Sequence, residues 1–291
     1  MVQSASGGDQ ECATPRGASL SKTLGRVMRD QSNHFLNFPN LDGHWENLGY
    51  WGSESDTYKV AAQRLASRVG EEACLKEGDR VLDLGSGYGD QISLWFDRFR
   101  IAELVALNPD QNQQRIAQTK VSPCLRGSVT LDIKNHNEFD GGPWDKVVAV
   151  DAAYFFSSFH EFLNRVFYSL NRGGCFAWTD VLLQRPIDRA FSRLKLRGVS
   201  NLTGIESAHW QTPDQCRERL QAIGFQRIVI TDIGEAVIDG FCAFVKKHRR
   251  LYGRQFSSSH WRKSAATAAV LKHLYKHDIV SYFIISAWKK P

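Results

Sequence analysis

The chain has 291 residues, of which 42% are apolar and 23% are charged. These proportions are typical of soluble globular proteins and exclude the compositional classes of disordered, collagen-like and disulfide-stapled chains. The length suits one large α/β domain with added segments, and no apolar run approaches the roughly 18 residues that span a bilayer. We therefore expect a cytoplasmic protein.

The net charge of +6 is unevenly distributed. Nine of the 37 cations lie between Lys246 and Lys276 without an intervening acid, and the remaining 28 face 31 acids, a net charge of −3. A basic run of this kind is most often a solvated face. The alternative interpretation is that residues 246–276 make a peripheral contact with an anionic membrane or bind a phosphate-bearing substrate.

Residues 1–34 are predicted to form a flexible lead. The first twenty are rich in Gly and Ser, with one cation at Arg16 and no apolar core, so they resemble neither a secretory signal nor a transit peptide. The six cysteines lie far apart without a C-x-x-C pair, which favours reduced thiols and gives no indication of a metal site.

From residue 35 onward, strand-like apolar runs alternate with helix-like segments. This alternation predicts a parallel sheet with helices on both faces. Helices are expected over 56–69 with Gly70 as its C-terminal stop, from a capping box at Thr212 to Gly224, and over about 264–277. Because a helix precedes the last strand, that strand need not run parallel to the others. The predicted strands are 80–84, 104–107, 129–133, 146–150, 175–179, 227–231 and 282–286.

The most informative stretch follows the first of these strands. Asp83 leads into a Gly-x-Gly-x-Gly turn at Gly85, Gly87 and Gly89, and a helix is expected to start near Gln91. Glycine permits positive φ and lets a ligand touch the backbone. A phosphate-binding P-loop would carry Lys-Ser/Thr after the last glycine, and the NAD fingerprint places its third glycine one residue later. Both of those ligand classes are therefore disfavoured.

This stretch resembles motif I of the class I S-adenosylmethionine-dependent methyltransferases, and the resemblance covers about residues 35 to 291. It implies a doubly wound, seven-stranded, Rossmann-like α/β fold that binds S-adenosyl-L-methionine. Further landmarks agree in order and spacing: Leu107-Asn108-Pro109, Leu131-Asp132-Ile133, the run from Trp144 to Tyr154, Arg172-Gly173-Gly174, and Leu220 to Phe225.

The resemblance also implies a set of cofactor-binding residues. Asn108 departs from the family, which usually places an Asp or Glu there on the ribose hydroxyls; an amide bonds a hydroxyl without charge. Replacing Asn108 by Asp is accordingly expected to keep or strengthen cofactor binding. The implied residues are Tyr50, Asp83, Gly85, Ser86, Gly87, Gly89, Gln91, Asn108, Asp132, Ile133 and Asp151.

Ahead of motif I, the segment from His44 to Trp51 is similar to the Gly-Tyr-Trp segment of tocopherol, sterol and cyclopropane-fatty-acid methyltransferases, which folds over the cofactor. His44, Tyr50 and Tyr154 are the candidate catalytic residues, whereas His209 is interpreted as a surface or capping histidine. A second, substrate-covering insertion is expected at about 185–210.

Aromatic side chains gather in the two segments that the resemblance places around the methyl group. Such a lining suits a hydrophobic, lipid-like or isoprenoid-like small molecule. Phe159 is instead expected in the core, and His160 is expected to be structural at a helix start. The predicted pocket residues are Trp45, Tyr50, Trp51, Tyr154, Phe155 and Phe156.

We therefore predict a methyltransferase that acts on a hydrophobic small molecule by in-line displacement. One alternative is a non-catalytic or NAD-type nucleotide-binding protein, for which Asn108 is the main argument. Another is an RNA methyltransferase. Base-amino methylases usually carry two prolines after the fourth strand, and Asp151-Ala152-Ala153-Tyr154 has neither, so a nucleic-acid partner is disfavoured.

Overall fold

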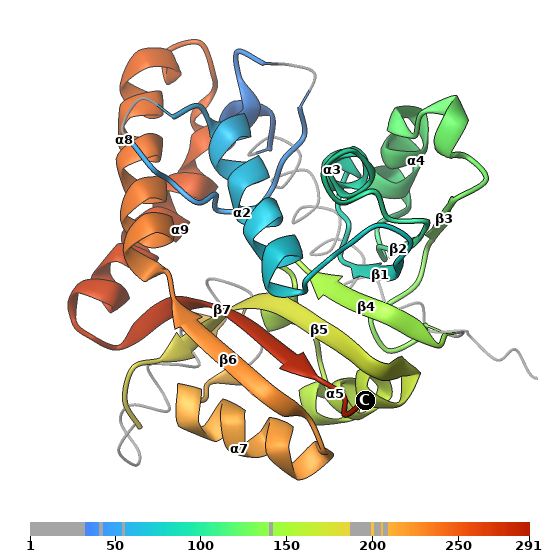
Figure 1. The fold of residues 1–291 in the computed structure, drawn as a ribbon. Helices are drawn as coiled ribbons and strands as arrows, with labels where there is room; N and C mark the ends of the chain where they lie inside the picture. Colours follow the sequence, from blue (N-terminus) through green and yellow to red (C-terminus); the bar gives the residue numbers. More distant parts are fainter. Residues whose placement is uncertain are drawn as a thin grey trace, which may run out of the picture.

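The computed structural model describes residues 33–40, 43–53, 56–139, 142–186, 199–200, 205 and 209–291. Its strands form one seven-stranded sheet of order β3-β2-β1-β4-β5-β7-β6 (Figure 1). All seven predicted strands are present, and β7 runs antiparallel to both β5 and β6 as the preceding helix allowed. The strands are β1 (Arg80–Leu84), β2 (Glu103–Leu107), β3 (Val129–Asp132), β4 (Trp144–Ala149), β5 (Leu170–Leu183), β6 (Gln226–Asp232) and β7 (Val280–Trp288).

Helices cover both faces of the sheet, so the doubly wound prediction is confirmed. Figure 1 shows α2 (Tyr58–Glu72), α3 (Asp90–Phe99) and α4 (Gln111–Lys120) on one side, with α5 (Phe159–Ser169) and α7 (Pro213–Ile223) on the other. Two short 3-10 turns, η1 (Pro123–Leu125) and η2 (Ala153–Phe155), lie in the connections.

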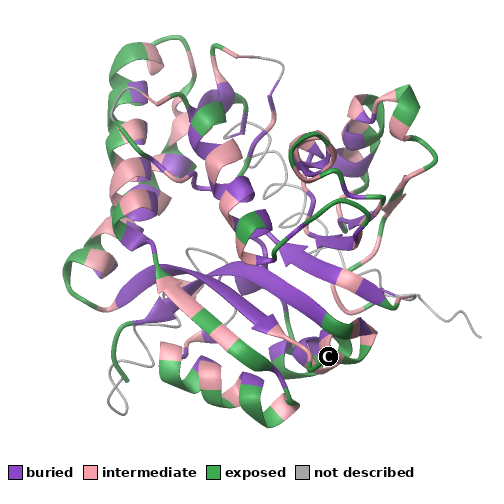
Figure 2. Cartoon of the chain, in the orientation of Figure 1, coloured by how far each residue is buried: buried purple, intermediate pink, exposed green. Residues whose placement is uncertain are grey.

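The alternation of side chains along the strands divides the core into two layers. Val81 belongs to the same buried cluster as Leu65 of α2 on one face, whereas its neighbour Leu82 belongs to the cluster of Phe162 of α5 on the other. Figure 2 shows the central strands buried along their length, and β6 alternately exposed as befits an edge. Because β1 pairs in parallel with β2 and β4, the carboxyl ends of these three strands meet at one rim of the sheet.

Two predicted helix boundaries differ from the structure. Gly70 does not end α2, which continues to Glu72; an added Cβ at Gly70 would lie 2.5 Å from Phe99, so this glycine allows α2 to approach α3. The late helix begins at Ser258 rather than near residue 264. The capping box is confirmed, since Thr212 and Gln215 bond reciprocally and Gly224 closes α7 in a left-handed conformation.

A long helical insertion separates β6 from β7. It contains the π-helical turn η4 (Glu235–Asp239), α8 (Gly240–Tyr252) and α9 (Ser258–Lys276). Figure 1 shows α8 and α9 at the left, beside the blue N-terminal segment and α2. None of the helices in the described ranges combines the length and apolarity needed to cross a membrane.

Two predicted segments lie largely outside the described residues. Of the lead, only residues 33 and 34 are described, and they begin a short helical turn over 33–37. Of the predicted insertion at 185–210, only 185–186, 199–200, 205 and 209–210 are described.

Candidate active site

The glycine loop after β1 has two tightly packed glycines and one open one. Gly85, Gly87 and Gly89 adopt φ of +83°, +56° and +79°. An added Cβ would lie 2.5 Å from Ala152 at Gly85 and 2.7 Å from Ala117 at Gly89, whereas at Gly87 the nearest atom is Glu46 Oε2 at 3.4 Å. Gly87 therefore leaves backbone that a ligand can approach.

Asp83 and Gln91 support this loop from within the protein. Gln91 Nε2 donates to both Asp83 carboxylate oxygens at 2.8 Å, and Trp95 Nε1 donates to one at 2.9 Å. Burial raises the pKa of Asp83 to about 6, although these hydrogen bonds lower it. Both residues are buried, so in this structure they bond each other and fix the strand-to-helix turn. A direct contact of either with the cofactor stays a prediction.

The polar residues after β2 form a chain of hydrogen bonds that ends on the N-terminal segment. Asn108 Nδ2 donates to Gly87 O at 2.9 Å and to Gln113 Oε1 at 2.7 Å. Gln113 Nε2 in turn donates to Glu46 Oε2 at 2.9 Å. Glu46 was not among the site residues predicted from sequence, and its partner lies 67 positions away.

Asp132 and Ile133 lie at the end of β3, next to the end of β2. Leu107 pairs with Asp132 across the two strands, which brings both residues to the rim that carries the glycine loop. The Ile133 side chain is 53% exposed, and Asp132 pairs with Lys134 at 3.4 Å. The pair therefore presents an apolar side chain and a carboxylate at this rim.

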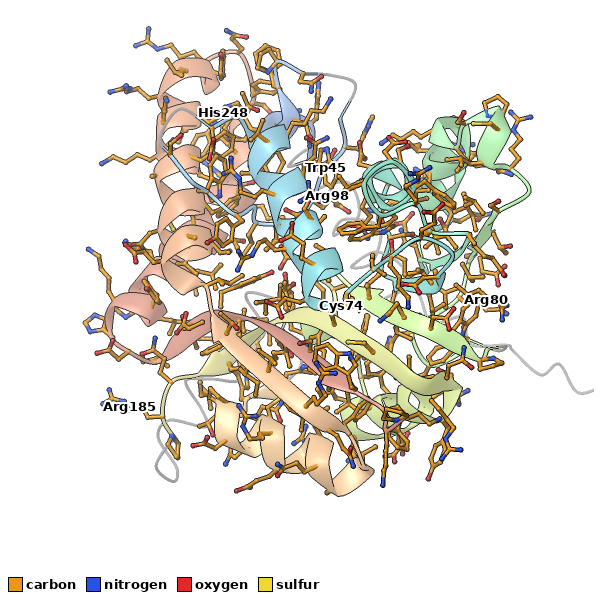
Figure 3. All side chains as sticks on the ribbon, in the orientation of Figure 1. Trp45, Cys74, Arg80, Arg98, Arg185 and His248 are labelled. Carbon is orange, nitrogen blue, oxygen red and sulfur yellow. The ribbon has the colours of Figure 1, made fainter. Side chains whose placement is uncertain are left out.

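Residues 43–53, which we call the flap, are anchored by backbone hydrogen bonds to the start of α3, to the end of β4 and to η4. The backbone amides of His44, Leu48 and Trp51 donate to Asp90 Oδ1 at 3.2 Å, Asp151 Oδ2 at 2.6 Å and Ala236 O at 3.0 Å, respectively. Figure 3 labels Trp45 of the flap and His248 of α8 toward the same end of the molecule. The flap thus links the glycine loop, the end of β4 and η4.

The carboxylate of Asp151 lies at the centre of a buried group that we call the tyrosine cluster: Asp151, Tyr154 and Tyr282. Both tyrosine hydroxyls donate to Asp151 Oδ1 at 2.5 Å. Burial raises the pKa of Asp151, although hydrogen bonds from both tyrosines and from Leu48 lower it. The pKa values of Tyr154 and Tyr282 are raised well above their usual range by burial and then by Asp151, so both phenols stay protonated near neutral pH.

Asp151 also has a constrained backbone. Its φ is +56°, a left-handed conformation that is uncommon for a residue other than glycine, and its amide donates to Thr179 Oγ1 at 2.7 Å. Tyr282 was missed from the sequence because it lies in an apolar run and resembles a core residue. The structure assigns its hydroxyl to the same oxygen as that of Tyr154.

The three predicted catalytic residues contact different groups. Tyr154 belongs to the tyrosine cluster. The His44 ring lies 5.2 Å from that of Tyr88 by the glycine loop, and its pKa is lowered by burial and by Lys120. Tyr50 packs under the guanidinium of Arg68 at 5.3 Å.

A cleft of about 1280 Å³ lies between the flap, the start of α2, η4 and α8. Tyr50 and Trp51 of the predicted aromatic pocket line it, whereas Tyr154 does not appear in its lining, Phe155 is 48% exposed, and Trp45 and Phe156 are buried. Other lining residues are Phe38, Phe244, Tyr252, Lys246, Lys247 and Arg250.

Three further predictions concern residues near α5. Phe159 is buried in the core as predicted, and His160 lies in the first turn of α5. The interpretation of His209 as a surface or capping histidine is wrong, because its side chain is fully buried. Its Nε2 lies 2.8 Å from Phe156 O, and its Nδ1 lies 3.7 Å from Asp180 Oδ2.

The rim fits a polar ligand such as S-adenosylmethionine. Among the described residues, Ser86 Oγ is buried without a hydrogen-bond partner, next to the open backbone of Gly87. An amide, a carboxylate and an exposed apolar side chain follow at the ends of β2 and β3. The described part of the chain contains no group of three or more His, Cys, Asp or Glu side chains that could hold a metal ion.

Comparisons with known proteins agree with this geometry. The family described as mycolic acid cyclopropane synthetase matches residues 27–201. The chain is 26% identical over 266 residues to the erythromycin 3''-O-methyltransferase of Saccharopolyspora erythraea, covering 86% of this chain and 85% of that relative.

Two solved structures have a similar fold. The cyclopropane synthase MmaA2 from Mycobacterium tuberculosis superposes with a TM-score of 0.72 at 14% identity, over 90% of this chain and 95% of that one. The mycolic acid cyclopropane synthase CmaA1, complexed with SAH and CTAB, superposes with a TM-score of 0.70 at 16% identity, over the same shares of the two chains.

Proposed function

Because the chain belongs to the mycolic acid cyclopropane synthetase family and is an S-adenosylmethionine-dependent methyltransferase, we propose that it methylates a hydroxyl oxygen of a hydrophobic natural product. The observation that carries this proposal is that the flap contacts the tyrosine cluster and also lines the cleft. Its Leu48 amide binds Asp151 of the tyrosine cluster, while Tyr50 and Trp51 line an aromatic cleft. The near full-length similarity to the erythromycin 3''-O-methyltransferase supports oxygen as the acceptor atom.

The residues of the rim would hold the cofactor. We assign Gly87 and Ser86 to direct contacts, with Asp132 and Ile133 beyond them, and Asn108 to the support of the Gly87 backbone. Bound S-adenosylmethionine supplies an electrophilic methyl group on a sulfonium. Asp83 and Gln91 act beneath the loop, where they keep its backbone in the conformation that leaves Gly87 open.

The tyrosine cluster would handle the proton of the acceptor. A hydroxyl that attacks a methyl group loses its proton as the new oxygen–carbon bond forms. Tyr154 can accept that proton while its own hydroxyl proton passes to Asp151, so the phenol stays neutral and the carboxylate becomes a carboxylic acid. Burial raises the pKa of Asp151, which makes this carboxylate a stronger base.

Alignment supplies the rest of the catalysis in this proposal. The flap covers the rim, orients the two reactants and excludes water. Holding two reactants in line can contribute roughly 7–11 kcal/mol at best. Because Tyr50 lines the cleft, we assign it to the wall of the acceptor site. Because His44 lies against Tyr88 by the glycine loop, we assign it to flap closure.

The basic segment would bring the protein to its acceptor. In α8, Lys246, Lys247, Arg249 and Arg250 are exposed, and three of these four line the cleft. We propose that residues 246–276 rest peripherally on an anionic membrane surface while a lipid-like or isoprenoid-like acceptor enters the cleft. Lys272 of α9 contributes less, because it pairs with Asp239.

The family match favours a second candidate, the transfer of a methylene bridge to an alkene of a lipid. The two reactions differ in one countable way. A hydroxyl keeps the whole methyl group, whereas an alkene that becomes a cyclopropane loses one hydrogen of that group as the ring closes.

The experiment uses a donor that carries a trideuteromethyl group. The protein is incubated with hydroxylated macrolides, unsaturated phospholipid vesicles and small polar alcohols, and products are analysed by mass spectrometry. We expect a macrolide-type product that retains all three deuterium atoms and is absent with Asp151→Asn. A lipid product that retains two would favour the second candidate, and a small, fully polar alcohol as best acceptor would contradict both.

A further inference from the structure

We propose that Glu46 of the flap supplies the carboxylate that binds the ribose hydroxyls of the cofactor, in place of an acidic residue at the end of β2. The inference concerns the cofactor and is independent of the acceptor proposed above. It rests on three observations about Asn108, Glu46 and the glutamine that connects them.

The first observation is that the side chain of Asn108 is committed to the protein. Its Nδ2 donates to Gly87 O and to Gln113 Oε1, and its Oδ1 accepts from the Asp110 amide at 3.3 Å. Asn108 is only 5% exposed. Its amide therefore braces the glycine loop, and these bonds compete with any it could make to a ligand.

The second observation is where the nearest carboxylate lies. Glu46 Oε2 is 3.4 Å from the position of an added Cβ on Gly87, so the carboxylate stands over the open face of the glycine loop. Glu46 is exposed, whereas its neighbours Trp45 and Asn47 are buried. The buried neighbours fix the backbone and leave the carboxylate facing the rim.

The third observation is that Gln113 orients both groups. It accepts from Asn108 through Oε1 and donates to Glu46 through Nε2, so the relay runs in one direction from amide to carboxylate. An aspartate at position 108 could not donate to Gly87 O or to Gln113 Oε1. Position 108 therefore requires an amide, which donates both of these hydrogen bonds, and the carboxylate at this rim comes from position 46 instead.

A carboxylate on the flap suits the chemistry of a ribose. Two adjacent hydroxyls can both donate to one carboxylate, and hydrogen bonds to a charged acceptor are roughly twice as strong as neutral ones. Because Glu46 belongs to the flap, this contact would also hold the flap closed over the bound cofactor. A cation also lies near this carboxylate: burial lowers the pKa of Lys120, and Asp90 and then Glu46 act against that lowering.

The test measures binding without turnover, by calorimetry with S-adenosylhomocysteine and with its 2′-deoxyribose analogue. The wild-type protein is expected to prefer the ribose form, and Glu46→Gln to bind that form about tenfold more weakly while losing most of the preference. Glu161→Gln, on the exposed face of α5, is the matched control and should change neither affinity.

A second experiment moves the carboxylate from position 46 to position 108. Asn108→Asp alone should weaken binding by at least about tenfold, because it breaks the relay and places two carboxylates near each other; this reverses the expectation from sequence. Asn108→Asp combined with Glu46→Gln should recover part of that loss.

The proposal would be overturned if Glu46→Gln weakened both analogues equally, which is the behaviour of a residue that only tethers the flap. It would also be overturned if Asn108→Asp tightened binding in the wild-type background. Thermal unfolding of the ligand-free variants distinguishes either result from loss of the fold. Neither readout depends on the acceptor, so failure here leaves the proposed reaction untouched.

Discussion

The two ends of the proposed active site are built in different ways. At the cofactor end, the rim of β1, β2 and β3 carries short loops whose polar groups are largely paired inside the protein, as in the pair of Asp83 and Gln91. At the proposed acceptor end, α8 presents exposed cations and the rings of Phe244 and Tyr252 to a wide cleft that η4 also lines. The backbone shapes the first end and side chains shape the second, so the two ends should respond to different substitutions.

The largest effect is expected from Gly87→Val. A side chain there would fill the open backbone face, and the φ of +56° disfavours a branched residue. We expect calorimetry to show S-adenosylhomocysteine affinity reduced by more than about 100-fold. Gly78→Val is the control, because Gly78 has a φ of +87° and no atom within 4 Å of an added Cβ. Equal loss of affinity in both variants would mean that backbone strain, and not the ligand face, is responsible.

The next effect tests whether the tyrosine cluster belongs to catalysis rather than to cofactor binding. Tyr154→Phe removes the hydroxyl that would pass a proton to Asp151, and we expect kcat to fall by about 100-fold with S-adenosylhomocysteine affinity unchanged. Tyr50→Ala should lower turnover through the acceptor wall, with a raised KM. Normal turnover of both variants would remove the proposed roles of these tyrosines.

Charge reversal in α8 probes the acceptor end alone. Changing Lys246, Lys247, Arg249 and Arg250 to Glu should weaken binding to phosphatidylserine vesicles by about tenfold, with a smaller difference at high salt. Cofactor affinity should stay as in the wild type. Lys76→Glu with Arg172→Glu, which reverses exposed cations at the opposite rim of the sheet, is the control. Equal losses from both sets would point to net charge instead of a defined surface.

The smallest expected effect comes from the buried carboxylate beneath the glycine loop. Burial raises the pKa of Asp83 from 3.8 to about 6, so the folded state holds this proton more tightly than the unfolded state does. The stability of the wild type relative to Asp83→Asn should therefore fall by about 1 kcal/mol as the pH rises from about 5 to about 8. Denaturant unfolding measures it, and a constant difference across this range would show that Asp83 titrates normally.

The cofactor end could be predicted from the sequence because its signals are local. Asp83 and the three glycines lie within seven residues of one another, and short apolar runs located all seven strands. Local signals also gave a wrong end for α2. Gly70 resembles a helix stop in the sequence, but the structure explains this glycine by its close approach to Phe99 on another helix.

The remaining features depend on residues that are distant in the chain. The hydroxyl of Tyr282 meets Asp151 across 131 positions, and Gln113 meets Glu46 across 67. No periodicity records such contacts, because they arise only when the sheet is assembled. The basic run likewise indicated a charged surface. That it folds into two helices, and that the first of them, α8, lines a cleft together with η4 and the flap, could not be predicted from the sequence.

The insertion that carries α8 and α9 leaves and re-enters the sheet at nearly one point. The Ile233 amide, just after β6, donates to the Tyr282 carbonyl of β7 at 2.8 Å. Segments whose ends lie this close can be exchanged without disturbing the domain that holds them. We therefore expect the insertion, which forms one side of the proposed acceptor cleft, to be exchangeable. Chimeras that carry the corresponding segment of a relative should keep the native cofactor affinity while acquiring that relative's range of acceptors.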